Sequence, residues 1–304
     1  MTATASEFTA PVPVPAPAQR PTKVRKQLTG RTVTARTVRF ALLLAFVILI
    51  LIPLYVMVVT SFKTAGDIRP TTAWSLPEHW SLSGWAKAWD QLSGPLLRTV
   101  VMAVVAATVS SMLGSLNGFV FAKWRFPGAN IVFTLFLFGM FIPYQAVIIP
   151  LQEIMLKAND LGLPKGIGTL IVVHVIYGIP ICTLIFRNYY ATTVPNEILE
   201  AGKVDGAGMW RTYRSIVLPI SIPGFVVTLI WQFTSAWNDF LFALFLTNAN
   251  NGPVTFVLNS LASGQNPDYA SNMAGALLAS LPTLAVYIIL GKYFIGGLMS
   301  GSVK

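Results

Sequence analysis

Polar side chains that could contact a solute are few, and most of them stand inside long apolar runs beside an aromatic residue or a proline. Amide groups can hold sugar hydroxyls while an aromatic ring covers the C–H face of the sugar. The candidates for such a solute path are Tyr144, Gln145, Tyr177, Gln232, Trp237, Asn238 and Tyr287. Hydrogen bonding between packed helices is the alternative role for each of them. His174 stands alone in its run, which predicts a hydrogen-bonded interior histidine and not a metal ligand.

Charged residues are missing from the middle of every apolar run. A charge at the centre of a membrane costs about 2.5–3.5 kcal/mol on insertion scales, so such charges mark ion or proton paths. Their absence argues against a proton-coupled pump and against a path for charged solutes.

Catalytic machinery is not evident in the sequence. The two Gly-Lys pairs, at Gly202 and Gly291, lack the upstream glycine and the following Ser or Thr of a phosphate-binding loop. No Ser/His/Asp set or metal cluster is evident, and the single cysteine, Cys182, cannot form an intramolecular disulfide. We therefore expect a non-catalytic chain without a cofactor of its own. If an ATP-driven process involves this chain, ATP and Mg would have to be bound by a partner.

A polar segment at residues 195–207 interrupts the apolar runs. Pro195 is typical of a helix start, and Glu197 falls in a first turn where the helix dipole favours negative charge. The dipeptide Asp205-Gly206 is typical of the turn that ends a helix. This helix is too short to cross a bilayer, so we expect it to lie along the membrane surface and contact a partner there. The residues expected to form its apolar face are Ile198, Leu199 and Val204.

The composition is that of a membrane protein. Of the 304 residues, 54% are hydrophobic and 11% are charged, whereas soluble domains carry about 25% charged residues. Mean hydropathy is +0.65. The net charge of +10 could indicate a nucleic-acid partner, but the basic residues flank apolar runs, so we expect no nucleic acid to bind.

Long apolar runs predict an all-α membrane protein with six transmembrane helices in one domain, residues 38–304. Each run is close to the ~20 residues that cross hydrocarbon. The expected spans are about 40–61, 99–122, 129–149, 167–186, 223–246 and 273–294. Residues 1–37 are rich in Thr, Ala and Pro, which predicts a disordered N-terminal segment.

Smaller features within the spans predict packing and bending. Ser110, Gly114 and Gly118 recur every four residues, which favours close contact between helices. Prolines within spans remove a backbone hydrogen bond and can kink a helix. These prolines are Pro143, Pro180 and Pro282.

The distribution of Lys and Arg predicts orientation. Most of the 21 basic residues fall on the cytoplasmic side when the N-terminus is placed inside. Both termini and the helix between spans four and five would then be cytoplasmic. Four tryptophans follow the first span on the opposite side, where they could rest at the membrane interface or contact an external binding protein. They are Trp74, Trp80, Trp85 and Trp89.

The polar segment carries a family resemblance. Glu200-Ala201, followed by Gly206, Ile216 and Leu218-Pro219, resembles the "EAA" loop of ABC-importer permeases. Gly202 departs from that pattern, because the family usually has a second alanine there. Trp237-Asn238 and the tail from Lys292 to Lys304 are similar to those of maltose-type permeases. The resemblance extends over about residues 38–304.

This resemblance implies a transmembrane subunit of a sugar ABC importer in the bacterial inner membrane, forming half of the pore. The implied partners are two ATP-binding subunits, a second permease subunit in a heterodimer, an extracytoplasmic solute-binding protein and membrane lipid. Glu200 would make the polar contact to the ATPase, and Gly206 would allow the sharp turn. The residues implied in ATPase coupling are Glu197, Ile198, Leu199, Glu200, Ala201, Gly202, Asp205, Gly206 and Ala207.

Two alternatives stay open at this point. A permease for amino acids, peptides or phosphonates would share the same loop. A secondary transporter working alone would need intramembrane charges or an internal inverted repeat, and neither is evident.

Overall fold

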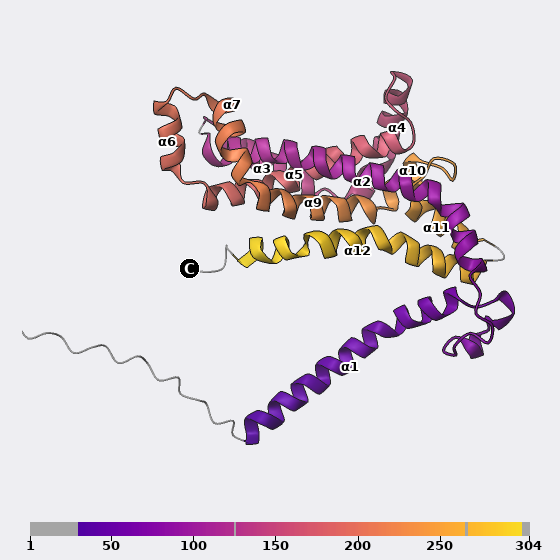
Figure 1. Cartoon of the computed structure of the whole chain (residues 1–304). Coiled ribbons are helices and arrows are strands. Elements are labelled where there is room, and N and C mark those ends of the chain that lie inside the picture. Colours follow the sequence, from indigo (N-terminus) through magenta and orange to yellow (C-terminus); the bar gives the residue numbers. More distant parts are fainter. Residues whose placement is uncertain (1–29, 125, 265–266, 300–304) are drawn as a thin grey trace, which may run out of the picture. The chain divides into compact units, whose positions relative to one another are not determined.

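The structure is a computed structural model that describes residues 30–124, 126–264 and 267–299. Every regular element in these residues is helical (Figure 1), so the all-α fold is confirmed. The chain divides into two compact units, residues 1–52 and 53–304. Four described helices are long and apolar enough to cross a membrane, or up to six if each of two bent pairs is one span. The six expected spans are the upper end of this range.

The first helix, α1, runs from Gly30 to Ser61 and contains the span expected at 40–61. Within Arg36–Ser61, the most apolar window of 18 residues has a mean hydropathy of 3.2, which suits a membrane span. Because α1 begins at Gly30, residues 30–37 are helical and not the irregular segment expected there. Residues 1–29 lie outside the described part of the chain.

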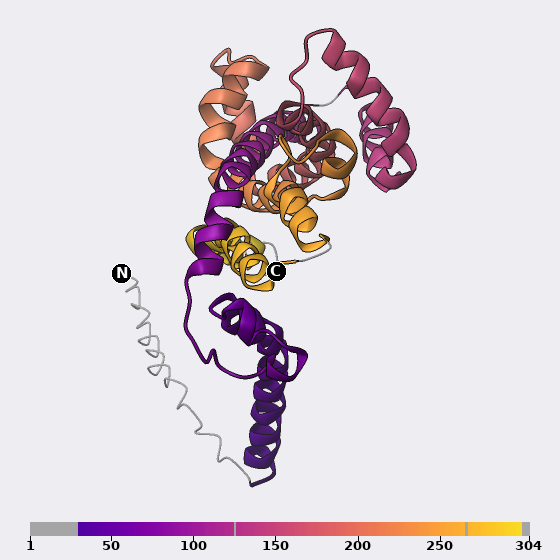
Figure 2. The same ribbon diagram turned by 90° about the vertical axis from the view of Figure 1, so that its right-hand side faces the viewer.

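Four long helices of the second unit pack side by side (Figures 1 and 2). They are α2 (Ser83–Lys123), α5 (Ile167–Thr193), α9 (Ile222–Trp237) and α12 (Tyr269–Met299). The spans expected at 99–122, 167–186 and 273–294 lie within α2, α5 and α12. Four of the solute-path candidates lie on these helices, namely Tyr177, Gln232, Trp237 and Tyr287.

Small residues allow α2 and α5 to approach closely. A Cβ atom at Gly114 would lie 2.4 Å from the Cβ of Cys182, and one at Gly118 would lie 2.6 Å from the Cβ of Phe186. Real Cβ atoms do not approach so closely, so larger residues at these positions would push the helices apart. The predicted packing role of this stripe is therefore confirmed.

The third expected span, 129–149, is wrong as a single helix. The chain forms α3 (Ala129–Phe141) and α4 (Tyr144–Asp160), which are bent by 96°. Pro143 stands at the break, where its missing N–H interrupts the helical hydrogen bonds. Helices α5 and α12 continue through Pro180 and Pro282, so these two prolines do not break their helices as Pro143 does.

The fifth expected span, 223–246, is also wrong as a single helix. Helix α9 ends at Trp237, and a separate helix α10 covers Leu241–Leu246. The carboxylate of Asp239 accepts the backbone N–H groups of Phe242 and Ala243, each at 3.3 Å. A side chain that accepts these free donors starts a new helix, so the chain turns instead of continuing.

Short elements connect the long helices. They are η1 (Ala65–Asp67), η2 (Pro70–Thr72), α6 (Asn196–Val204), α7 (Met209–Thr212), the π-helical turn η3 (Tyr213–Val217), α8 (Leu218–Ile220) and α11 (Val254–Ala262). Figure 1 shows α6 and α7 at one end of the bundle and α4 and α10 at the other. The surface helix and α4, which carries the solute-path candidates Tyr144 and Gln145, are therefore at opposite ends.

The tryptophans after α1 differ in their surroundings. The ring of Trp85 is half-buried and lies 5.6 Å from the ring of Phe62. Trp74, Trp80 and Trp89 are exposed. Contact with lipid headgroups and contact with a binding protein both stay predictions for this surface.

Candidate functional site

Helix α6 forms where the sequence predicts the surface helix. It runs from Asn196 to Val204, follows Pro195, and carries Glu197 in its first turn and Lys203 in its last. Both charges are placed favourably for the helix dipole. A helix of nine residues is not stable alone in water, so its conformation depends on packing against the bundle.

The end of α6 is a Schellman turn at Gly206. The N–H of Ala207 donates to the carbonyl of Gly202 at 2.8 Å, and the N–H of Gly206 donates to that of Lys203 at 3.0 Å. Gly206 has a φ of +74°, which a residue with a Cβ adopts only with strain. The predicted sharp turn is confirmed, and it directs the chain from α6 into α7.

The apolar residues of α6 do not form one face, so that expectation is wrong. Leu199 is 8% exposed and packs with Phe119, Tyr190 and Tyr213, whereas Val204 is 88% exposed. At about 100° per residue, Val204 stands about 140° around the helix from Leu199. Leu199 and the buried Gly202 therefore face the bundle, and the side available to a partner carries other residues. The exposed residues are Asn196, Glu197, Ile198, Glu200, Ala201, Lys203, Val204 and, just after the helix, Asp205.

A buried network of hydroxyl groups lies behind α6. The Ser115 hydroxyl is 2.6 Å from the Tyr190 hydroxyl and 2.9 Å from that of Tyr213, and Tyr190 is also 2.8 Å from the Ser221 hydroxyl. These residues belong to α2, α5, η3 and the start of α9. Sequence reasoning missed this network, because its four members are scattered along the chain. It ties the segment after α6 to three long helices.

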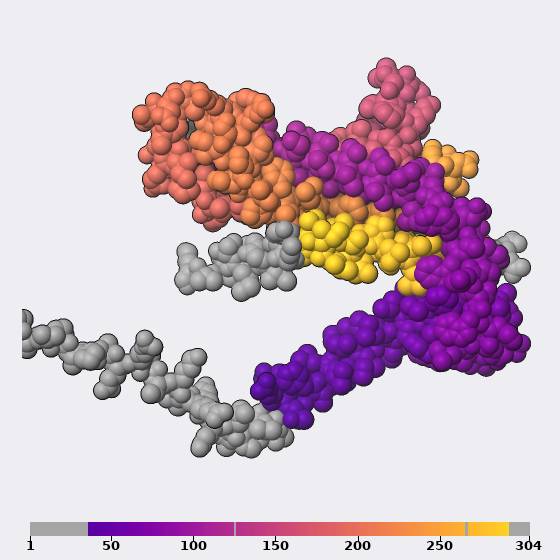
Figure 3. All heavy atoms as spheres, in the orientation of Figure 1, coloured from indigo at the N-terminus to yellow at the C-terminus, as the bar shows by residue number. Residues whose placement is uncertain are grey.

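A cleft of about 580 Å³ opens between α6 and the end of α2. Lys123 donates to the side-chain carbonyl of Asn196 at 3.1 Å, and the Lys203 ammonium lies 5.9 Å from the centre of the Trp124 ring. The lining residues are Phe119, Ala122, Lys123, Trp124, Ala191, Asn196, Leu199, Glu200, Lys203 and Thr212. In Figure 3 the atoms of α6 and α7 are open to view at this end of the bundle.

At the other end of the bundle, two solute-path candidates share one aromatic neighbour. The ring centres of Tyr144 and Tyr177 lie 5.3 and 5.1 Å from that of Phe242. Tyr144 is 39% exposed and Tyr177 is 37% exposed, while Phe242 is buried beneath them. Tyr144 follows the α3–α4 break, and Phe242 follows the α9–α10 break. Sequence reasoning missed Phe242, because it took residues 223–246 as one span.

His174 lies behind this aromatic group. Its ring meets that of Phe242 edge-on at 5.7 Å, and its Nε2 lies 3.5 Å from Oδ2 of Asp239. Both side chains are largely buried, at 5% and 11% exposure. The predicted burial is confirmed. Nε2 makes no hydrogen bond with the described residues, and its polar neighbour is the Asp239 carboxylate.

The other solute-path candidates are not gathered at one place. Gln232 is buried and donates to the carbonyl of His174 at 2.9 Å, and Trp237 is buried and donates to the carbonyl of Ala279 at 3.0 Å. Asn238 is exposed and donates to the carbonyl of Thr234 at 2.9 Å. The polar atoms of Gln232 and Trp237 thus join helices, which is the alternative role considered for them. Gln145 and Tyr287 are exposed.

Comparison of the sequence with known proteins identifies the family of the chain. Residues 111–295 match the family model described as "Binding-protein-dependent transport system inner membrane component". The chain is similar to the xylose/arabinose import permease protein XacI of Haloferax volcanii, with 35% identity over 286 residues, or 86% of this chain and 92% of the relative. It is also similar to the diacetylchitobiose uptake system permease protein NgcG of Streptomyces coelicolor, with 28% identity over 269 residues and 87% of each chain covered.

A solved structure shares the fold. The fold is similar to a chain in the crystal structure of a bacterial ABC transporter involved in the import of the acidic polysaccharide alginate, with a TM-score of 0.74 and 18% identity. The likeness covers 88% of this chain and 98% of that chain. Together, the family model and the relatives show that the chain belongs to the family of binding-protein-dependent transport system inner membrane components.

Proposed function

We propose that this chain is a membrane-spanning subunit of an ATP-driven importer of sugars and forms half of its pore. Membership of a binding-protein-dependent family supports the importer role. The relatives named for xylose/arabinose and for diacetylchitobiose support sugars as the substrate class. The structural observation that carries the coupling role is α6, a short exposed helix whose inner side is fixed to the bundle.

In this proposal α6 docks into an ATPase subunit. Glu200 pairs with a basic residue of that subunit, and the small side chain of Ala201 lets the two surfaces approach. Ile198 supplies apolar contact, since it is 42% exposed. Leu199 and Gly202 hold the helix against its own bundle, so they position the docking surface without touching the partner.

Movement of α6 then reaches the spans through the buried hydroxyl network. Tyr213 follows α6 and α7 directly, and its hydroxyl shares Ser115 with Tyr190. When the ATPase subunits close on ATP and Mg, a shift of α6 would therefore displace α2 and α5 together. A ligand can bias such a change only by binding one state more tightly than the other.

The complete transporter in this proposal has further chains. Two ATP-binding subunits, a second permease of related fold and an extracytoplasmic solute-binding protein join this chain in the membrane. The family's dependence on a binding protein supports the last of these. The excess of Lys and Arg on one side supports a cytoplasmic location for α6 and both termini.

The coupling role is tested by Gly206→Pro in the assembled transporter. Proline cannot adopt the φ of +74° found at Gly206, so the Schellman turn would open and α6 would lose its orientation. We expect uptake into proteoliposomes to fall at least tenfold while ATP hydrolysis persists. The matched control is Gly208→Pro, because Gly208 has a φ of −73° that proline accepts. Normal uptake by Gly206→Pro would contradict the role of α6.

We also propose that Tyr144 and Tyr177 face the solute path. They are the two candidates with exposed rings on a shared aromatic neighbour, and both Tyr144 and that neighbour, Phe242, follow a break between helices. Exposed aromatic faces suit the C–H surface of a sugar. Phe242 and the His174–Asp239 pair would support these rings from behind.

The solute path is tested by Tyr177→Ala. Loss of one aromatic contact is worth about 0.5–1.5 kcal/mol, so KM for sugar uptake should rise about two- to tenfold. Tyr269→Ala serves as the control, since Tyr269 is another exposed tyrosine, at the start of α12. An equal effect of both substitutions, or none of either, would remove Tyr177 from the path without affecting the coupling proposal.

A further inference from the structure

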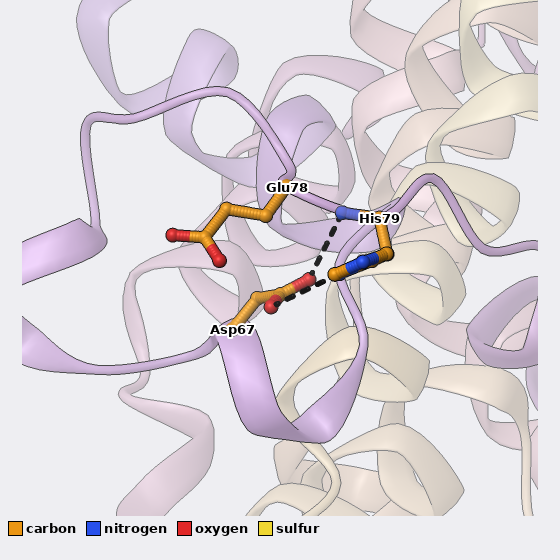
Figure 4. Close-up of side chains that lie close together, drawn as sticks. All are labelled: Asp67, Glu78 and His79. Carbon is orange, nitrogen blue, oxygen red and sulfur yellow. Dashed lines mark hydrogen bonds and ion pairs between the residues drawn. The ribbon is translucent and has the colours of Figure 1, made fainter.

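We propose that Asp67, Glu78 and His79 form a binding site for a divalent metal ion of the zinc class. The three side chains each offer one ligand atom, and these atoms all lie within 4.8 Å of one another (Figure 4). They belong to the folded segment between α1 and α2, away from α6 and from the aromatic group around Phe242. Sequence reasoning found no metal cluster, because Asp67 and His79 are 12 positions apart without a spacing motif.

The ligand types decide the class of ion. An imidazole suits Zn²⁺, Cu²⁺, Ni²⁺ and Co²⁺, whereas Mg²⁺ and Ca²⁺ prefer oxygen atoms alone. Two carboxylates balance the charge of a divalent ion. Three protein ligands and one water complete the tetrahedral coordination that zinc adopts in open sites.

The distances are close to those of a formed site. In a tetrahedral zinc site with bonds of about 2.0–2.1 Å, neighbouring ligand atoms lie about 3.3 Å apart. Nδ1 of His79 lies 4.0 Å from Oδ1 of Asp67, so this pair needs to close by less than ~1 Å around the ion. The His79 side chain is 80% exposed and Glu78 is exposed, so both have room to rotate inward.

The backbone around the site is already held in place. The N–H of His79 faces Oδ2 of Asp67 at 3.4 Å, and the Thr72 hydroxyl donates to the backbone carbonyl of Asp67 at 2.6 Å. Below them, the buried ammonium of Lys63 donates to the carbonyl of Thr72. Hydrogen bonding from Thr64 holds the pKa of Asp67 below its usual value, which keeps this ligand ionised at neutral pH.

A bound ion would join the two ends of a loop. Asp67 belongs to η1, while Glu78 and His79 come just before Trp80, whose ring packs 5.7 Å from that of Phe62. The N–H of Ser81 donates to the carbonyl of Phe62 at 2.9 Å, so the loop is already closed at its base. The ion would add a second closure and stiffen the connection between α1 and α2.

The test is a titration of the full-length chain in detergent with zinc chloride, after purification on a tag without histidine. The background is low, because the chain has 2 histidines and 1 cysteine, and both His174 and Cys182 are buried. We expect one zinc ion per chain by calorimetry, and a tetrahedral absorption band when Co²⁺ replaces it. Asp67→Asn, Glu78→Gln and His79→Ala should each weaken binding at least about tenfold. Asp90→Asn, an exposed carboxylate on nearby α2, should bind zinc as the wild type does.

Two results would overturn the proposal. One is the absence of saturable zinc binding to the wild-type chain. The other is binding that survives any one of the three ligand substitutions undiminished, since that ligand would then be outside the site. The titration needs neither ATP nor sugar, so its failure is distinct from failure of the transport proposal.

Discussion

Glu200 is the acidic residue of α6 that lines the cleft beside the helix, where Lys123 and Lys203 are also found. Its carboxylate is exposed beside these two lysines, so it is the group that attracts a basic residue of a partner against their repulsion. A third positive charge in place of Glu200 would make the same surface repel that partner.

The substitution Glu200→Lys should therefore release the ATPase subunits. We expect them to be lost from the detergent-solubilised complex on affinity purification, while the membrane subunits stay together. Glu153→Lys is the control, because Glu153 is exposed on α4 at the opposite end of the bundle. Unchanged co-purification of the ATPase with Glu200→Lys would count against docking through this residue.

The residues of α6 show what local sequence can and cannot predict. The turn at Gly206 was predictable, since Asp-Gly has a local conformational preference that the structure keeps. The burial of Leu199 and the exposure of Val204 were not, because they depend on where Phe119 and Tyr213 pack. The pairing of His174 with Asp239 was equally hidden, since it joins α5 to the turn between α9 and α10.

At the scale of elements, α6 and η3 depend on the hydroxyl network for their position. Tyr190 is its central member, with hydroxyl contacts to both Ser115 and Ser221 inside a buried cluster. A buried donor or acceptor that loses its partner is destabilising by about 1–3 kcal/mol. The network therefore contributes both stability and a fixed geometry between α5 and the segment after α6.

The substitution Tyr190→Phe should lower the thermal midpoint in detergent and reduce the sugar transported per ATP hydrolysed. The expected loss of stability is about 1–3 kcal/mol, because the hydroxyls of Ser115 and Ser221 lose a partner. Tyr189→Phe is the matched control, since its hydroxyl makes one exposed hydrogen bond to the carbonyl of Ile220. Equal and small effects of the two substitutions would show that the network does not carry coupling.

The long helices were predictable and the breaks were not. Sustained apolar runs located α1, α2, α5 and α12, because a membrane span needs length and hydropathy above all. The break before Tyr144 and the one after Trp237 lie within runs that are apolar on both sides. The second break falls on the polar pair Asn238-Asp239, but two polar residues do not by themselves end an apolar run. Pro143 indicated a kink, but the 96° bend depends on tertiary packing.

At the scale of the whole molecule, the chain belongs to a family of inner-membrane components, and its four to six candidate spans suit that location. The orientation of the chain in the membrane stays a prediction from its basic residues. This orientation requires that α6 is accessible from the cytoplasm, where ATP is found, and that accessibility can be measured.

We predict that, in cells without the ATPase subunits, a cysteine at position 201 reacts with a membrane-impermeant maleimide only in inside-out vesicles. Ala201 is exposed on α6, and Cys182, which is buried, is replaced by serine so that one thiol is present. Asp90→Cys in the same background should label only from the outside of intact cells. Labelling of position 201 from outside would contradict the orientation and with it the coupling proposal.

Helix α2 has 41 residues and continues without a break from Ser83 to Lys123. At 1.5 Å per residue it is about 60 Å long, roughly twice the thickness of membrane hydrocarbon. One end contacts the cleft beside α6, and the other adjoins the loop with the three clustered ligands. Because the helix is this long, a tilt of about 5° about one end moves the other end by about 5 Å. Small angular changes are thus sufficient for long-distance signalling along this chain, and no flexible joint is needed between its two extremities.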